Sequence, residues 1–311
     1  MKNRLLPASL ALVIILGSAL VSGCGKDGGD EKSIVVTHSI LGSIVKELAG
    51  DEVPVIVLMP DGADPHDWEP SARDIERLNK AGLIVWNGLD LEVSIEAAVE
   101  TAVSRGVKLF TATDHIVIRY VGEGEIVEHE NGGEGEEHEL KAGAPDPHFW
   151  VDPLAMKSVV TALAAEMKAT LGLDVDSRAR DLESRLDALH SDIALKMSQV
   201  APGSRKLVTG HDSMGYFARR YGFQLIGAVI PSLSTQAEVS AADLAALITQ
   251  IRENQVKAIF TETGTSAALV QAVSRETGAR VVELSPVILP ADGSYFTFMS
   301  NLAEKVAEAL E

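Results

Sequence analysis

Short runs of β-branched residues alternate with amphipathic segments in the first half of the chain. The strand-like runs are 34–37, 53–58, 83–86 and 107–110. Helical patterns occupy the stretches 41–49, 72–80 and 93–104. Because strands and helices in alternation are typical of parallel βαβ units, we expect an α/β lobe over residues 33–153.

The same alternation returns in the second half. Its strand-like runs are 206–209, 223–229, 258–261 and 281–284, again separated by helical segments. The sequence therefore predicts a second α/β lobe of similar build over residues 204–311.

Two long helical patterns, 154–171 and 177–200, lie between the halves. In the second, apolar residues recur at three- and four-residue spacing. These positions are Leu182, Leu186, Leu189 and Ile193. We expect a helical linker over 154–203 in which a long helix joins the lobes; a coiled-coil or dimer face would produce the same pattern.

The start of the chain differs from both lobes. Lys2 and Arg4 precede an apolar run that ends before Cys24. That run would extend about 24 Å as a helix at about 1.5 Å per residue, short of the bilayer core of about 30 Å. We interpret residues 1–23 as a secretory signal peptide.

Cys24 is the only cysteine, and residues 20–24 resemble a bacterial lipobox. We expect lipidation of Cys24, a flexible tether over 24–32, and an exported protein anchored in a membrane, facing the periplasm or the cell exterior. The alternative is a buried free thiol, but the glycines around Cys24 offer no core. One cysteine excludes an internal disulfide and any zinc site with several cysteines.

Charge narrows the range of partners. Of the 311 residues, 45 are acidic and 27 are basic, which gives a formal net charge of −18. This balance gives no support for binding a nucleic acid backbone. An acidic surface attracts cations, but it also serves solubility alone.

Any metal site must use His, Asp and Glu, and three histidines stand out. His66 follows the second predicted strand, and His211 follows the first strand of the second half. Ligands of open α/β sheets bind beyond the carboxyl ends of strands, so these two side chains are expected in one cleft. His148 lies in a proline-flanked loop. Three imidazoles suit Zn²⁺ and leave one coordination position, although each alone could be a turn or capping residue.

The segments around these histidines carry a family resemblance. Gly-Ala-Asp-Pro-His (62–66), Asp-Pro-His-Phe-Trp-Val-Asp-Pro (146–153) and Gly-His-Asp-Ser-Met-Gly-Tyr-Phe-Ala (210–218) together resemble the zinc- and manganese-binding lipoproteins of bacterial ABC importers, the cluster A-I metal-binding family. The resemblance implies two (β/α)4 lobes with parallel sheets, bridged by a long helix, and a metal site in the inter-lobe cleft. It places the ligands on His66, His148 and His211. Relatives with His at the third position tend to bind zinc, and those with Glu there manganese.

The fourth ligand departs from the family pattern. Ser285 stands where many relatives carry an aspartate. A water molecule or Glu262 is then expected to complete the coordination shell, unless Glu262 orients a histidine through its other ring nitrogen.

The acidic, glycine-rich loop 122–143 contains His129 and His138. Similar loops in zinc-specific relatives imply accessory zinc capture, and a solvated spacer is the alternative.

These features predict an extracytoplasmic, high-affinity Zn²⁺-binding protein that delivers zinc to an ABC permease, acts as a monomer and is not an enzyme. The alternatives are manganese or iron transport within the same family and a metal-dependent adhesin. A zinc hydrolase would need an activated water beside Glu262. The sequence lacks a His-Glu-x-x-His helix, which argues against that activity.

Overall fold

The computed structural model describes residues 33–122 and 143–311. The first sheet is entirely parallel and has the order β2-β1-β3-β4. Its strands are β1 (Ile34–Val36), β2 (Val55–Val57), β3 (Leu83–Trp86) and β4 (Lys108–Thr111). All four lie where the sequence predicts them, within a few residues at each end.

The second sheet repeats this arrangement, with the order β6-β5-β7-β8 and parallel pairing throughout. Its strands are β5 (Lys206–Thr209), β6 (Gln224–Ala228), β7 (Ala258–Thr261) and β8 (Arg280–Glu283). The predicted fold class of two α/β lobes with parallel sheets is confirmed.

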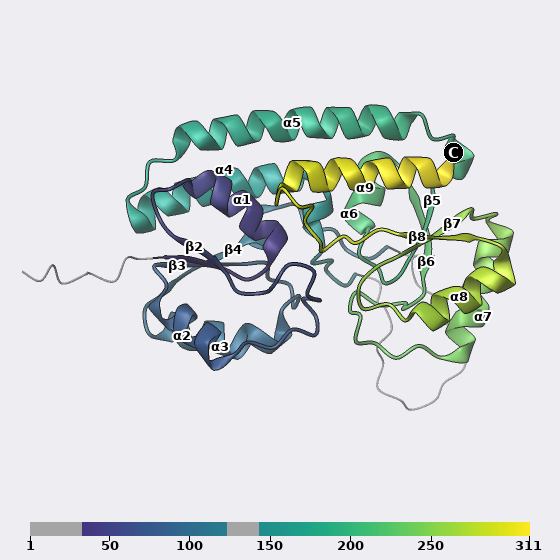
Figure 1. Cartoon of the computed structure of the whole chain (residues 1–311), viewed down its shortest axis with the longest axis horizontal. Helices are drawn as coiled ribbons and strands as arrows, with labels where there is room; N and C mark the ends of the chain where they lie inside the picture. Colours follow the sequence, from purple (N-terminus) through teal and green to yellow (C-terminus); the bar gives the residue numbers. More distant parts are fainter. Residues whose placement is uncertain (1–32, 123–142) are drawn as a thin grey trace, which may run out of the picture. The chain divides into compact units, whose positions relative to one another are not determined.

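Helices cover both faces of each sheet (Figure 1). The first lobe contains α1 (Ser39–Ala49), α2 (Ala72–Lys80) and α3 (Val93–Ser104). The second contains α6 (Gly215–Tyr221), α7 (Ala241–Glu253) and α8 (Ala267–Thr277). In β1, Ile34 and Val36 pack into one apolar cluster and Val35 into another, and all three are buried. A central strand buried on both faces requires this continuous apolar run rather than alternation.

Three further helices lie on one side of the sheets, and the longest of them extends over both lobes (Figure 1). They are α4 (Pro153–Leu171), α5 (Asp176–Ser198) and α9 (Tyr295–Leu310). The periodic apolar positions of α5 are buried in a core cluster that contains Ile34 of the first sheet and Leu207 of the second. The apolar face of the predicted long helix is therefore buried inside the molecule, against a core that both lobes share. It is not exposed for a coiled coil with another chain.

No helix within residues 33–122 and 143–311 is long and apolar enough to cross a membrane. Cys24, His129 and His138 lie outside the described residues.

Candidate metal site

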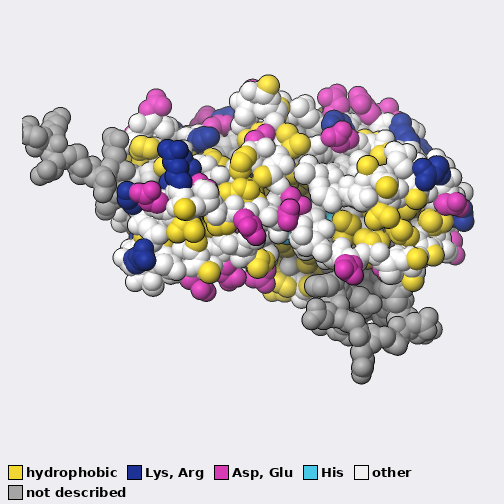
Figure 2. Space-filling view, turned by 60° about the horizontal axis from the view of Figure 1, so that its bottom comes forward, with side chains coloured by type: hydrophobic (Ala, Val, Ile, Leu, Met, Phe, Trp, Pro, Cys, Tyr) yellow, Lys and Arg dark blue, Asp and Glu magenta, His cyan; other side chains and the backbone are white. Residues whose placement is uncertain are grey.

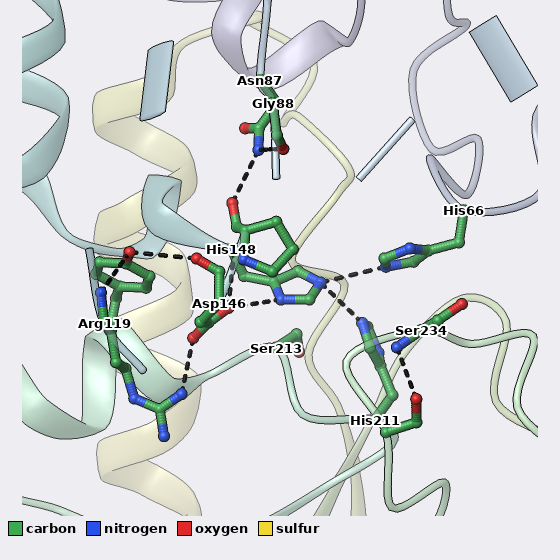
Figure 3. A network of polar contacts seen from close by, with 12 residues as sticks. His66, Asn87, Gly88, Arg119, Asp146, His148, His211, Ser213 and Ser234 are labelled. Carbon is green, nitrogen blue, oxygen red and sulfur yellow. Dashed lines mark hydrogen bonds and ion pairs between the residues drawn. The ribbon is translucent and has the colours of Figure 1, made fainter. Parts of the chain in front are cut away.

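Three loops bring His66, His148 and His211 together (Figure 3). His66 belongs to the segment between β2 and α2, His148 directly precedes the short 3-10 helix Phe149–Val151, and His211 follows β5. The His148 Nε2 atom lies 3.2 Å from His66 Nε2 and 3.1 Å from His211 Nε2. The predicted trio therefore meets at one point: His66 and His211 come from loops that follow strands of the two different sheets, and His148 comes from the loop before α4.

A cavity of 10 Å³ adjoins the three imidazoles. It has room for about one water molecule or one ion. The side chains of His148 and His211 are almost fully buried, whereas His66 is partly exposed. On the face shown in Figure 2, acidic side chains lie near the middle, where a small area of histidine is visible, and most Lys and Arg side chains lie toward the ends. The site suits a single small cation.

Asp146 holds the His148 ring from behind. Its Oδ1 atom lies 2.9 Å from His148 Nδ1 and also accepts the His148 backbone N–H at 2.9 Å. The other carboxylate oxygen accepts from Arg119 Nη1 at 2.9 Å, and both side chains are buried. Asn87 Nδ2 donates to the carbonyl of Pro147 at 2.9 Å, which fixes the same loop from the first lobe. The loop is thus preorganised around one imidazole orientation.

Glu262, at the end of β7, does the same for His211. Its Oε1 atom lies 2.7 Å from His211 Nδ1 and accepts the His211 backbone N–H at 2.9 Å. Ser213 Oγ donates to Oε2 at 2.9 Å. A Cβ atom on Gly210 would lie 2.1 Å from Thr265 Oγ1 and 3.0 Å from Glu262 Oε1, so a side chain at this position would have to displace these groups. The Glu262 carboxylate therefore binds Nδ1 of His211, on the side of the ring away from the other two histidines.

The carboxylates set the protonation of the site. Burial opposes charge on Asp146 and Glu262, but the imidazole hydrogen bonds and neighbouring positive charges outweigh it, and both pKa values are lowered. Burial lowers the pKa of His148, and burial together with the neighbouring imidazoles lowers the pKa of His66 to about 2. Burial also opposes charge on His211, yet the Glu262 carboxylate raises its pKa. Any proton held by the metal-free trio therefore resides on His211.

The Nε2 atoms carry the chemistry of the site. Because ionised carboxylates only accept, the Nδ1 atoms of His148 and His211 donate to Asp146 and Glu262, which leaves a lone pair on each Nε2 of the neutral rings. Two such atoms 3.1 Å apart repel unless a proton or cation lies between them. Nitrogens bound at about 2.0 to 2.1 Å to a tetrahedral Zn²⁺ are separated by about 3.3 to 3.4 Å, so the observed spacings suit this ion.

Ser285 and two further histidines do not line this cavity. Ser285 Oγ donates to Glu283 Oε1 at 3.3 Å and does not line the cavity. His38 is buried and caps α1, with its Nδ1 accepting from the Leu41 N–H at 3.4 Å. His115 is exposed and stacks on Phe110.

Sequence reasoning missed Asp146 and Arg119 as supports of the site. Asp146 lies two residues before His148, and a carboxylate at that spacing was a usable signal. Nothing local identifies Arg119, because its pairing with Asp146 spans 27 residues.

Comparison with known proteins identifies the family. A family model described as "Zinc-uptake complex component A periplasmic", ZnuA, matches residues 34–309. This chain belongs to the ZnuA family. Membership confirms the resemblance noted in the motifs around the three histidines, and it covers nearly all the described residues.

Three curated relatives show the range of this ZnuA family. The zinc-binding lipoprotein AdcA of Streptococcus pneumoniae is 30% identical over 90% of this chain, which spans only 55% of the length of AdcA. The high-affinity zinc uptake system protein ZnuA of Bacillus subtilis is 30% identical over 89% of this chain and 85% of its own length. The manganese ABC transporter lipoprotein PsaA of S. pneumoniae is 25% identical over 96% of this chain and 97% of its own.

Among solved structures, the periplasmic zinc-binding protein TroA from Treponema pallidum has the same fold. It superposes with a TM-score of 0.73, covers 90% of this chain and 99% of its own, and is 24% identical. The two parallel sheets and their flanking helices therefore follow the architecture of this family.

Proposed function

We propose that this protein is the extracytoplasmic Zn²⁺-binding component of an ABC importer, with His66, His148 and His211 as the metal ligands. The observation that carries the proposal is the meeting of three Nε2 atoms. In His148 and His211 the Nδ1 proton is donated to Asp146 and Glu262, which leaves the Nε2 lone pair free to bind a metal. Zn²⁺ is a borderline-soft ion that binds neutral imidazoles. Because these rings are already buried and oriented, binding adds little free-energy cost for desolvating or reorienting them.

The donor set favours zinc over manganese. Manganese prefers carboxylate and carbonyl oxygen, whereas zinc accepts an all-imidazole set. Within the described part of the chain, the cluster contains three histidines and no carboxylate. Glu262 is directed to His211 Nδ1, which supports its role as an orienting group and leaves water as the fourth ligand. Manganese transport remains the second candidate because of the similarity to PsaA.

The remaining parts of the chain complete the proposed carrier. Residues 1–23 act as the signal peptide, Cys24 is the lipid anchor, 24–32 form the tether, and a membrane permease receives the metal. His129 and His138 provide accessory zinc capture. The helices between 154 and 203 connect the lobe at 33–153 to the lobe at 204–311.

The test is a metal-binding titration of the mature chain after removal of metal by a chelator. Competition against a chromophoric chelator gives zinc affinity, and X-ray absorption gives the donor atoms. We expect one tightly bound zinc with three imidazole nitrogens. Each of His66→Ala, His148→Ala and His211→Ala should abolish tight binding, and the exposed His115→Ala is the matched control. His129→Ala with His138→Ala should remove only weaker, additional zinc.

Three results would overturn the proposal. A chain that ignores added zinc would exclude the site, as would three alanine variants that keep the affinity of the control. Tighter binding of Mn²⁺ than Zn²⁺ in direct competition would move the assignment to manganese transport.

A further inference from the structure

The three proposed ligands are not held equally. His148 and His211 each donate a ring proton to a buried carboxylate. His66 Nδ1 has no such acceptor among residues 33–122 and 143–311, and its side chain is partly exposed. Its position must therefore come from the backbone of its loop.

Asp64 shapes that loop. Its Oδ1 atom accepts the His66 backbone N–H at 3.0 Å. Its carbonyl oxygen accepts from the backbone N–H groups of Asp67 at 3.2 Å and Trp68 at 3.0 Å. One residue thus closes the turn on which His66 is carried.

The second carboxylate oxygen of Asp64 reaches the other lobe. Thr235 Oγ1, from the segment between β6 and α7, donates to Asp64 Oδ2 at 2.6 Å. Thr235 is 9% exposed, so the bond is largely shielded from water. A Cβ atom on Gly264 would lie 2.5 Å from Asp64 Oδ2 and 2.9 Å from Thr235 Cγ2, so the loop after β7 closes tightly over this pair.

From these contacts we infer that Asp64 is a positioning residue that couples His66 to the second lobe through Thr235. This inference rests on the proposed metal site. While Thr235 holds Asp64, the His66 turn is fixed toward His148 and His211; when the second lobe moves away, the turn is released and His66 is the first ligand to leave. The lobe contact controls retention of the metal without touching it.

Loss of the contact between Thr235 and Asp64 should mainly change the rate at which Zn²⁺ is released. Removing an orienting partner behind a metal ligand costs about ten- to hundred-fold in affinity. Because the coupling exists only in the closed arrangement, the loss should appear in the dissociation rate, with the association rate nearly unchanged.

The experiment is stopped-flow release of Zn²⁺ into excess chelator, combined with equilibrium competition. Thr235→Val should release zinc about ten- to hundred-fold faster than the unmodified chain. Thr235→Ser keeps the hydroxyl and should restore slow release. Thr249→Val, which removes an exposed hydroxyl bonded within α7, is the matched control. Asp64→Ala should accelerate release further, and Thr235→Val should add nothing to it.

The possible outcomes separate the inference from the function beneath it. If the unmodified chain and Thr235→Ser both fail to bind zinc, the proposed function is wrong. If both bind it and Thr235→Val releases it at the same rate, or if the effects of Asp64→Ala and Thr235→Val simply add, the coupling is wrong. Circular dichroism checks folding, and Thr235→Ala replaces the valine variant if that one does not fold.

Discussion

Glu262 Oε1 lies 2.7 Å from Nδ1 of His211, and this contact decides which nitrogen of the ring is available to a metal. The carboxylate accepts the Nδ1 proton, so Nε2 faces His148 with its lone pair. The sequence allowed Glu262 either to bind the metal or to orient a histidine. In the structure its carboxylate contacts the Nδ1 side of the His211 ring.

Replacing Glu262 should weaken zinc binding without removing a ligand. Glu262→Gln keeps an amide oxygen for the His211 ring but loses the negative charge, and we expect about tenfold weaker binding. Glu262→Ala also loses the acceptor and should cost about a hundredfold. Chelator competition measures both, with the exposed Glu253→Gln as the control. Equal affinities for all three variants would mean that Glu262 does not orient the ligand.

Zinc affinity should depend on one proton. The pKa of His211 is raised above its ordinary value of 6.5, whereas those of His66 and His148 are lowered. Below the His211 pKa the metal must displace the proton on this ring, so affinity falls by up to about tenfold per pH unit, and above it affinity levels off. The decline therefore begins above pH 6.5, the ordinary pKa of a histidine.

Two measurements check this dependence. Competition titrations across pH give the slope, and calorimetry in buffers of different ionisation enthalpy counts the released protons, expected at about one per zinc near pH 6. A flat profile, or release of two or three protons, would contradict this assignment of the proton to His211.

The sequence located the three histidines of the proposed site better than the groups that hold them. His66 and His211 could be expected in one cleft because ligands of open α/β sheets bind beyond the carboxyl ends of strands, and each histidine follows a strand of a different lobe. The motif around His148 supplied the third. Each of these signals lies within a short stretch of sequence, so it can be recognised without knowledge of tertiary contacts.

The supporting contacts could not be obtained in this way. Thr235 lies 171 residues from Asp64, and Glu262 lies 51 from His211. Such pairings follow from how two lobes pack, and no periodicity encodes them. The side chain of Ser285 likewise occupied the expected fourth position in sequence but turned toward Glu283 in space.

A methyl group on Gly215 should disturb the site from a distance. A Cβ atom there would lie 2.1 Å from Arg119 Nη1, and this guanidinium bonds Asp146, which holds His148. Gly215→Ala should therefore displace Arg119, lower the free energy of unfolding by about 1 to 3 kcal/mol and weaken zinc binding. Gly203→Ala is the control, because nothing lies within 4 Å of its added Cβ. Matching melting temperatures and zinc affinities for both variants would refute the predicted clash.

Zinc should stabilise the folded chain, and chelation should reverse the effect. The three proposed ligands come from loops that meet only after folding, so the unfolded chain lacks the assembled site. A ligand that binds only the folded state contributes about 4 kcal/mol at a free concentration a thousand times its dissociation constant. For a chain of this size that corresponds to an increase in melting temperature of roughly 10 °C. Calorimetry with buffered zinc and with a chelator measures it. His148→Ala should lose the shift because it removes the ligand shared by both close Nε2 pairs, and a shift of the same size in that variant would place the stabilising zinc elsewhere on the chain.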